Sequence, residues 1–508
     1  MSGTGRHRHA DRYFVLGAVA ACLLLYVPAL VTPLLPDEAG YWLVARSWDP
    51  EPDNMFGFYW ADRPPMLIWM YQAADVIGGP YAPRLWPAVL GALTVVATFR
   101  ATMLIGGPIA ARWSTVAAVA LLGNPAWYAW AAKAESLGVP LVMVSCWLSL
   151  EALQRRQDWA RLALAVGAGA AGMLALGMKQ NLASGLVFGA VLLAVSVLRR
   201  QLRLREVALL AGAAITGAML PLVVVLVWAE VNGVRISTLW EMIYGFRSDA
   251  FGVITRGDLS APLERVFHLV TLCLASGLAL LVGLFLASLR HALVVRPAVV
   301  AAVLAMILVD VTGIVLGGSY WMPYLLALIP AAVLSTALVV AGGALVPPMR
   351  VVVAFAAGSS LVLLAYFGFI HVTGRSYATW ATYRGEAVGE VAQPDDSILV
   401  LYGSPEVVRA SGLDSPYPYL WSLPIRTLDP HLAQMRTTIQ GPDAPEWIVQ
   451  RSGLNRWSID SDHRLRDLLH RRYDAVGAVC GGRIWLLKGE SRPELPPVDC
   501  GRPFRQIG

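Results

Sequence analysis

A loop between the first two long apolar segments of this chain carries the side chains best suited to chemistry. Residues 34–72 read LLPDEAGYWLVARSWDPEPDNMFGFYWADRPPMLIWMYQ. Pro36 bars a helix before it, so Asp37 and Glu38 begin a helical run whose free N–H groups favour carboxylates. Tyr41 falls four residues after Asp37, on the same helix face. The plainer interpretation is a helix cap in a solvated loop. Holding carboxylates at a bilayer surface costs free energy, however, which favours a functional role for them.

More charged side chains stand at segment ends that would meet this loop if the apolar segments cross a membrane in alternation. They are the cations Arg63, Arg84, Lys133 and Lys179, the acid Glu135, and the aromatic residues Tyr320 and Trp321. A phosphate leaving group needs cations already in place. An acceptor hydroxyl needs a carboxylate base, whose pKa we expect burial to raise. A second acid can bind a metal, orient the base or hold sugar hydroxyls. This set therefore predicts a site for an anionic, lipid-linked substrate.

Each member of the set also has a plainer interpretation. Arg84, Lys133 and Lys179 would serve equally well as anchors at a membrane interface. Glu135 would pair with Lys133 or cap the helix after it. Tyr320 would belong to an aromatic belt. The assembly is stronger evidence than any one of these residues.

The elements that position these residues are membrane spans. The chain has 508 residues, of which 57% are hydrophobic and 15% charged, more apolar than a soluble protein needs. Its net charge of +6 does not indicate nucleic-acid binding, because the arginines lie in short loops between apolar segments. Eleven segments are long enough to cross a bilayer. They are 13–33, 84–105, 112–130, 136–153, 161–178, 182–198, 206–229, 266–289, 297–316, 322–346 and 351–371.

The arginines predict the orientation of these spans. They occur before the first span and in every second turn after it, which places the N-terminus and these turns in the cytoplasm. The acidic loop and the tail after 371 then lie outside. The first apolar run is too long for a signal peptide and lacks a small-residue cleavage site, so we expect an uncleaved helix in a multi-pass plasma-membrane protein. The aromatic loop 230–265 would gate access from the lipid or form an interfacial belt.

The tail 376–508 predicts a small extracytoplasmic α/β domain. Strand-like stretches at 397–402 and 446–450, and later AVGAV and RIWLLK, alternate with helical stretches at 405–412 and 462–473. No phosphate-binding glycine motif follows its first strand. We expect a cap or an acceptor-binding module without chemistry of its own. Its two cysteines, Cys480 and Cys500, could pair outside the cytoplasm.

Three pairs of stretches carry a resemblance to a known family. They are PDEAGYWLVAR with YWADRPPMLIWMYQ, PRLWPAVLGAL with AWAAKAESLGVPLVMVSCWL, and LALGMKQNLA with GGSYWMPYLLALIP. Over about residues 13–345 the chain resembles the C-type (GT-C fold) polyprenyl-phosphate-dependent glycosyltransferases, in the branch of protein O-mannosyltransferases and aminoarabinose transferases. The resemblance implies a GT-C-like transmembrane domain over 1–375, with an outer catalytic loop at 34–83.

The resemblance also implies roles for single residues. Asp37 would be the catalytic base, Glu135 the second acid, Arg63 a donor-phosphate contact and Lys179 the basic residue of a Lys-Gly-Pro-like turn. We place Glu38 with the catalytic acids, Arg84 and Lys133 with the phosphate-binding cations, and Tyr41 and Tyr320 with the substrate contacts. Departures from the family pattern, such as Arg63 for lysine and Gln180-Asn181 for Gly-Pro, leave the sugar and a divalent cation open. No other cofactor is expected.

The leading hypothesis is an inverting glycosyltransferase. It would move mannose or arabinofuranose from a polyprenyl-monophosphate donor to an envelope polysaccharide, glycolipid or protein. The alternative is a transporter or flippase of lipid-linked sugars, which should carry intramembrane charges and two matching halves. Asp310 is the main carboxylate inside a predicted span, and the sequence shows no two matching halves. A non-catalytic scaffold would leave the outer charges unexplained.

Overall fold

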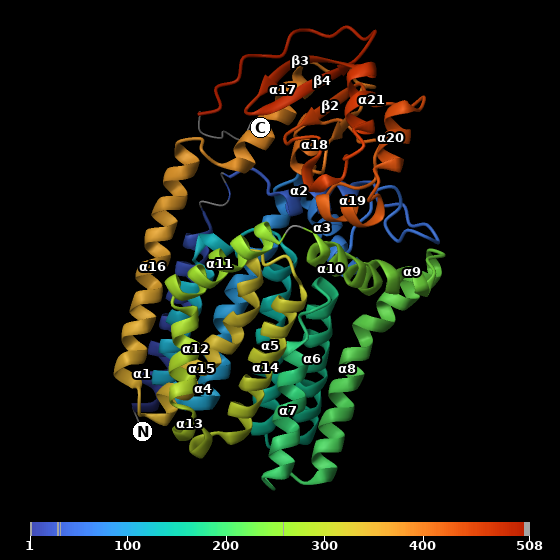
Figure 1. The fold of residues 1–508 in the computed structure, drawn as a ribbon. Helices are drawn as coiled ribbons and strands as arrows, with labels where there is room; N and C mark the ends of the chain where they lie inside the picture. Colours follow the sequence, from blue (N-terminus) through green and yellow to red (C-terminus); the bar gives the residue numbers. More distant parts are fainter. Residues whose placement is uncertain (1–2, 28–29, 31, 258, 502–508) are drawn as a thin grey trace.

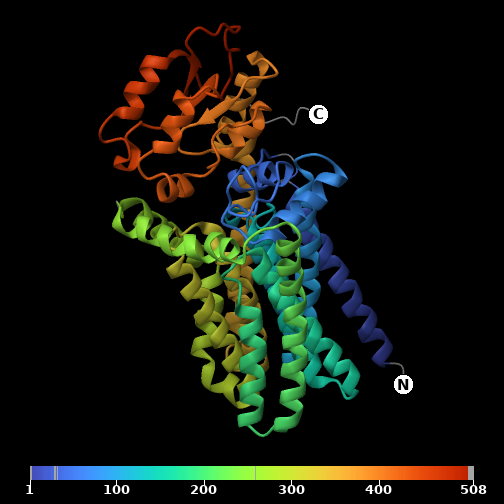
Figure 2. The ribbon, with the colours of Figure 1, turned by 90° about the vertical axis from the view of Figure 1, so that its right-hand side faces the viewer.

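The molecule has two parts, a bundle of long apolar helices and an α/β part that stands over one end of it (Figure 1). The computed structural model describes residues 3–27, 30, 32–257 and 259–501. The first helix begins at the end of the bundle that lies away from the α/β part, as both side views show (Figure 2). We call the end beneath the α/β part the outer end and the opposite one the inner end.

The bundle consists of helices that could cross a membrane. Within the described residues, eight are long and apolar enough, or nine if one bent pair counts as a single span. The eight are α1 (Gly3–Tyr26), α4 (Leu85–Leu122), α5 (Ala134–Gln154), α6 (Asp158–Met178), α8 (Leu204–Val231), α14 (Pro297–Leu316), α15 (Ile329–Gly342) with the turn η5 (Met322–Leu328) before it, and α16 (Val346–Val372). The bent pair is α11 (Ser260–Ala275) and α12 (Leu278–Ala287), which differ in direction by 67°. The short helix α13 (Leu289–Val295) leads from this pair to α14.

The helix α4 folds back on itself. Gly107 has φ 74° and ψ −167°, a conformation open to glycine, and Pro108 follows it. Arg84, just before α4, and the backbone N–H of Ala132, shortly after it, both donate to the Glu38 carboxylate. A straight helix of 38 residues would be about 57 Å long and would hold these two donors far apart. The chain therefore reverses near Gly107.

This reversal explains much of the difference between the predicted and observed spans. The predicted segments 84–105 and 112–130 fall largely on the two arms of α4, and 266–289 falls on the bent pair. Segment 182–198 is α7 (Ser184–Leu198), whose 15 residues are fewer than the ~20 that a crossing needs. Within the described residues each predicted segment thus coincides largely with helix; residues 28, 29 and 31 of the segment 13–33 lie outside them. The number of eleven spans stays a prediction.

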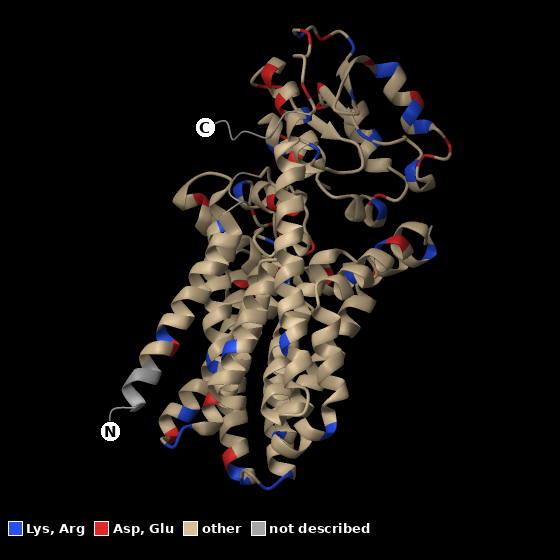
Figure 3. Ribbon diagram, turned by 90° about the vertical axis from the view of Figure 1, so that its left-hand side faces the viewer, with Lys and Arg blue, Asp and Glu red and all other residues tan. Residues whose placement is uncertain are grey.

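Basic residues mark the inner end of the bundle. The turn between α7 and α8 lies there and reads RRQLR over 199–203 (Figures 1 and 3). The start of α1 lies at the same end. This is the distribution expected when the inner end faces the cytoplasm, because short basic loops are retained there.

Glycines bring α6 and α8 into backbone contact. A Cβ on Gly169 would lie 1.8 Å from the carbonyl oxygen of Ala214. One on Gly217 would lie 1.9 Å from the carbonyl oxygen of Val166. Small residues at helix crossings favour association in lipid because they allow this close approach. The pair of glycines therefore holds α8, which is otherwise largely exposed, against the bundle.

Short helices cover the outer end. The two predicted in the acidic loop are confirmed as α2 (Pro36–Arg46) and α3 (Pro65–Gly78), and the turns η2 (Ala82–Arg84) and η3 (Pro125–Trp127) follow later. The predicted loop 230–265 is mostly helical: α9 (Ile236–Trp240), the π-helical turn η4 (Glu241–Gly245) and α10 (Phe246–Arg256) lie across this end (Figure 1). The side chain of Trp240 is 61% exposed, which suits an interfacial position. The gating role of this segment stays a prediction.

The α/β part begins with α17 (Tyr377–Val391) and contains one four-stranded sheet. The strands are β1 (Ile398–Val400), β2 (Trp447–Gln450), β3 (Tyr473–Val479) and β4 (Gly482–Leu487), in the order β1-β2-β4-β3. The pair β1–β2 is parallel and the other two are antiparallel. The helices are α18 (Pro405–Ser411), α19 (Ser422–Leu428), α20 (Ala433–Gln440) and α21 (Arg464–Arg472), with the turn η6 (Arg456–Ser458). All four predicted strands and the helices at 405–412 and 462–473 are confirmed.

A disulfide closes the end of the α/β part. Cys480 and Cys500 are bonded, with their Cα atoms 5.5 Å apart, so the pairing considered from the sequence is confirmed. Cysteines pair stably in oxidising compartments. The bond therefore agrees with a position of this part outside the cytoplasm.

Candidate active site

Two of the predicted site residues, Glu38 and Arg84, are bound to each other in the interior. The Glu38 Oε1 accepts from Arg84 Nε at 2.9 Å and Oε2 accepts from Arg84 Nη2 at 2.7 Å. The backbone N–H groups of Leu35 and Ala132 each donate to the same carboxylate at 3.0 Å. The side chains are only 1% and 2% exposed, and Arg84 also donates to the carbonyl of Thr32.

These contacts are structural in kind. Burial alone would raise the pKa of Glu38, but the Arg84 guanidinium and the two backbone donors outweigh it and hold the pKa below its usual range. The pair ties the start of α2 to the start of α4 and to the segment before α5. The catalytic role predicted for Glu38 and the phosphate-binding role predicted for Arg84 stay predictions.

Asp37, the next residue, has a different environment. Its Oδ2 accepts from Lys133 Nζ at 2.7 Å, and its side chain is 31% exposed. We expected burial to raise the pKa of this acid, and that expectation is wrong. Burial does act in that direction, but the charges of Lys133, Arg63 and Lys179 prevail and lower the pKa. Asp37 is therefore ionised at neutral pH, and three cations lie close enough to affect it.

Glu135 pairs with Lys179 and not with Lys133, the partner considered from the sequence. Its Oε1 accepts from Lys179 Nζ at 2.5 Å, and the two side chains are 8% and 7% exposed. The Lys179 ammonium lies 3.9 Å from the centre of the Tyr324 ring. A carboxylate and an aromatic face thus both contact this buried side chain. The pair links the start of α5 to the residue that follows the end of α6.

Arg63 belongs to a third group, which includes two residues that the sequence analysis did not select. Asp62 accepts from Arg63 Nη1 at 2.6 Å and forms a second ion pair with Arg247 of α10. Gln180 donates to the Asp62 carbonyl at 3.4 Å and to the Ile243 carbonyl at 3.0 Å. Asp62 stands directly before Arg63, a signal that was visible in the sequence. Its partner on α10 was not, because 184 positions separate them.

We call the seven residues of these three groups the outer charge cluster: Asp37, Asp62, Arg63, Lys133, Glu135, Lys179 and Arg247. It contains four cations and three acids. Its members influence one another, since Asp62, Asp37 and Glu135 together raise the pKa of Arg63 even though burial opposes this. The Nε of Arg63 is buried and has no hydrogen-bond partner within the described part of the chain. A cluster with one cation in excess and a free guanidinium N–H can receive an anion.

The two predicted tyrosines differ in position. Tyr41 is 2% exposed and its ring lies 5.8 Å below the Arg63 guanidinium, so it borders the outer charge cluster. The hydroxyl of Tyr320 donates to the Val315 carbonyl at 3.4 Å. The ring that meets Lys179 belongs to Tyr324 instead. The substrate contacts predicted for Tyr41 and Tyr320 both stay predictions.

The acids of the cluster are dispersed among cations. Among the residues that the structure describes, no group of three or more His, Cys, Asp or Glu side chains is placed to hold a metal ion. In the cluster itself each acid faces a lysine or an arginine at ion-pair distance. The divalent cation therefore stays an open expectation from the sequence.

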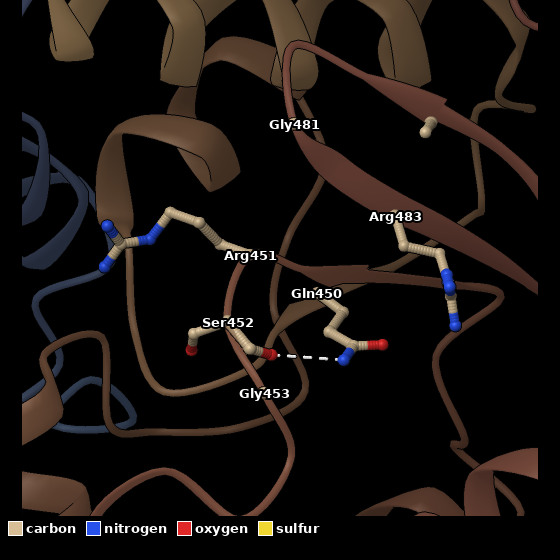
Figure 4. Close-up of a pocket in the computed structure, with 7 residues that line it drawn as sticks. Gln450, Arg451, Ser452, Gly453, Gly481 and Arg483 are labelled. Atoms are coloured by element: carbon tan, nitrogen blue, oxygen red, sulfur yellow. Dashed lines mark hydrogen bonds between the residues drawn. The ribbon is translucent and has the colours of Figure 1, made fainter.

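A hollow of about 350 Å³ lies elsewhere, in the α/β part. Its lining includes Gln450, Arg451, Ser452 and Arg483, and none of the outer charge cluster. The side chains of Arg451 and Arg483 point away from each other (Figure 4). They do not converge on a common ligand, so we assign no role to this hollow.

Comparison with known proteins identifies the fold. No family model and no curated protein matches the chain. Among solved structures it is similar to ArnT from Cupriavidus metallidurans bound to undecaprenyl phosphate, with a TM-score of 0.59 and 16% identity over 93% of this chain and 97% of that one. The same protein in the apo state gives a TM-score of 0.61 and 15% identity over 94% and 98% of the two chains.

A second similarity is to the Archaeoglobus fulgidus oligosaccharyltransferase in the apo form. The TM-score is 0.54 and the identity 13%, over 86% of this chain and 70% of that one. At such identities the likeness shows the fold alone. The GT-C-like helical fold with a small C-terminal sheet, predicted from the sequence, is thereby confirmed.

Proposed function

We propose that this chain transfers a sugar from a polyprenyl-monophosphate donor to an acceptor hydroxyl at the outer face of a membrane. The outer charge cluster carries the proposal. Its Asp37 side chain is 31% exposed, whereas those of Asp62 and Glu135 are 16% and 8% exposed. Asp37 is therefore the acid of the cluster that an acceptor arriving from water can best reach. The fold shared with ArnT, solved with undecaprenyl phosphate, supports a lipid-phosphate donor.

In this proposal the cations receive the donor phosphate. Arg63 has a free buried N–H, and Lys133 and Lys179 lie close enough to act on the same region. As the bond between the anomeric carbon and the phosphate oxygen breaks, its electron pair passes to the phosphate, whose growing charge the fixed cations stabilise. They stay in place through the reaction because each is already paired with an acid.

Asp37 accepts the proton of the attacking hydroxyl in the same step. The new bond forms on the face of the sugar opposite the phosphate, so the configuration at the anomeric carbon inverts. A carboxylate with a lowered pKa is a weak base. It suffices if the proton moves late, because the hydroxyl becomes far more acidic as its oxygen bonds to the electron-poor carbon. Lys133 then has a clear function, which is to keep Asp37 ionised and oriented.

The finer assignments follow from the sequence-based hypothesis. Mannose and arabinofuranose are the sugars we propose to test, which covers a hexosyl and a pentosyl transferase. The acceptor is an envelope polysaccharide, glycolipid or protein. The basic inner turns and the Cys480–Cys500 bond support a plasma-membrane position with the N-terminus in the cytoplasm and the α/β part outside. The ion pair of Glu38 with Arg84 holds the elements of the site together, while the catalytic role of Glu38 and the phosphate-binding role of Arg84 stay predictions.

The test is a transfer assay in proteoliposomes with radiolabelled polyprenyl-phosphate mannose or arabinofuranose and cell-envelope acceptors. Asp37→Asn should lower the transfer rate by roughly 10²- to 10⁴-fold, the range for loss of a general base. The matched control is Asp53→Asn, which changes a 75% exposed acid of the same loop and should leave the rate unchanged. Transfer by the Asp37→Asn variant at the wild-type rate would remove the assigned base. Labelled lipid that changes leaflet without bond cleavage would favour the transporter alternative.

A further inference from the structure

The α/β part touches the catalytic loop through helix α18 and through the segment of residues 415–421. The backbone N–H of Trp60 donates to the carbonyl of Pro418 at 3.1 Å. The hydroxyl of Tyr59 accepts from the backbone N–H of Ser415 at 2.9 Å. These contacts join two parts of the chain that are more than 350 positions apart. The segment is therefore held at the edge of the outer charge cluster.

Trp421, at the end of this segment, lies directly on α2. A Cβ added to Gly40 would come within 2.1 Å of the Trp421 ring, so the absence of a side chain there makes room for the indole. The ring centres of Trp421 and Tyr41 are 5.4 Å apart. On its other edge Tyr41 meets Tyr71 in a T-shaped contact at 5.7 Å. Tyr41 is thus fixed between two aromatic rings.

Tyr41 in turn borders the phosphate-binding arginine. The Arg63 guanidinium carbon lies 5.8 Å from the centre of the Tyr41 ring, within the range of a cation–π contact. The only side-chain ion pair of Arg63 among the described residues is with Asp62, through Nη1. Its Nε is buried and has no hydrogen-bond partner in the described part of the chain. The orientation of that N–H therefore depends on Asp62 on one side and on the Tyr41 ring on the other.

We propose that Trp421 is a positioning residue. It fixes the Tyr41 ring and, through this ring, the Arg63 guanidinium that binds the donor phosphate. This inference rests on the function proposed above. It assigns the α/β part a task in donor binding, beyond the cap or acceptor-binding module expected from the sequence. Trp421 itself need not touch the donor.

The rest of the interface allows this role to be separated from simple docking. Helix α18 packs against α2, and the Arg409 guanidinium lies 5.5 Å from the centre of the Trp42 ring. The Trp60–Pro418 and Tyr59–Ser415 hydrogen bonds are backbone contacts of the segment and do not involve the indole. The α/β part therefore has several other contacts that hold it in place when the indole is removed.

The first test measures binding of undecaprenyl phosphate, without any sugar, to the purified full-length protein in nanodiscs. Trp421→Ala should raise Kd by roughly three- to tenfold, as expected when a cation–π contact loses its alignment. Trp421→Phe, which keeps a ring against Tyr41, should restore most of the affinity. In the transfer assay Trp421→Ala should raise the donor KM by a similar factor with little change in kcat.

A matched control comes from the same domain. Trp457 contacts Tyr402, Arg426 and Arg456, and none of its ring contacts in the described residues reaches α2. Trp457→Ala removes an indole of the same size and should leave Kd for undecaprenyl phosphate unchanged. Equal Kd values for Trp421→Ala and the wild type would overturn the proposal.

The second test uses the glycine that faces the indole. Alanine is a better helix former than glycine, so Gly40→Ala would be harmless without the neighbouring ring. With the ring present it should displace Trp421 and raise Kd for undecaprenyl phosphate as Trp421→Ala does. The double variant Gly40→Ala/Trp421→Ala should bind no more weakly than Trp421→Ala alone. Gly358→Ala in α16, where an added Cβ meets nothing within 4 Å, is the control.

The outcomes separate this inference from the proposed function. A multiplicative loss in the double variant would overturn the coupling between Gly40 and Trp421. If the wild type transfers no sugar but Trp421→Ala still weakens lipid binding, the proposed function is wrong and the positioning role of Trp421 is supported. Normal sugar transfer by the wild type, combined with normal lipid binding by Trp421→Ala, would sink the positioning role alone.

Discussion

Removing the Glu38 carboxylate should cost a large part of the protein's stability. Glu38→Met removes the acceptor of four hydrogen bonds, two of them from the Arg84 guanidinium. It leaves an arginine side chain that is 2% exposed without its counter-ion. Breaking a buried ion pair in this way costs about 3–5 kcal/mol. Because native proteins are stable by about 5–15 kcal/mol, this is a large share of the total.

The second half of the prediction concerns the double variant Glu38→Met/Arg84→Met. It removes the buried arginine charge as well and keeps similar volumes, so it should be more stable than Glu38→Met alone. It will remain less stable than the wild type, since the backbone N–H groups of Leu35 and Ala132 lose their acceptor. The assay is denaturant unfolding in detergent, monitored by tryptophan fluorescence at pH 7. It compares the wild type, the two single variants Glu38→Met and Arg84→Met, and the double variant.

Two results would refute this reasoning. A double variant no more stable than Glu38→Met would show that the Arg84 charge is not the main cost. A double variant that folds but has lost transfer as completely as Asp37→Asn would show that Glu38 or Arg84 takes part in the chemistry. We expect instead a folded double variant with reduced but measurable transfer.

Three further predictions concern other parts of the structure. Because Lys133 helps to lower the pKa of Asp37, wild-type transfer should persist as the pH falls to the ordinary carboxyl range. In Lys133→Met the acid limb of the pH–rate profile should move to higher pH. An acid limb at the wild-type pH would contradict the pairing of Lys133 with Asp37. Asp62→Asn removes the carboxylate that pairs with Arg247 and should raise the donor KM roughly tenfold. An unchanged donor KM would show that Asp62 does not contribute to phosphate binding. Cys480→Ser opens a link across 20 positions and should lower the free energy of unfolding by about 3 kcal/mol, and a reductant should mimic it on the wild type.

Local patterns made much of the fold predictable. The helix 36–46 follows from a proline, two acids and an apolar run, and the four strands follow from short apolar stretches between turns. The reversal within α4 was foreseeable as well, because Gly107 and Pro108 interrupt one long apolar stretch. In each case the residues that predict the helix, strand or turn lie within a few positions of it in the sequence.

The pairing within the outer charge cluster was not predictable in the same way. The sequence indicated that acids and cations meet at the outer end, but not that Glu135 pairs with Lys179, 44 positions away. That choice depends on how α5 and α6 pack. The pKa of Asp37 was predicted to rise because burial is visible in a sequence pattern, whereas the three cations that lower it are assembled only by the fold. Arg247 was missed because its helix looked like a loop of aromatic residues.

The most direct measurement is an electron cryo-microscopy structure of the full-length protein in nanodiscs with bound undecaprenyl phosphate. We predict that the phosphate lies at the outer end of the bundle, within about 3 Å of a nitrogen of Arg63 and of one of the two lysines, Lys133 or Lys179. Asp37 should lie beside it and remain open to water. A phosphate bound among the arginines of the inner turns, or at the outer end out of reach of Arg63, would contradict the central claim.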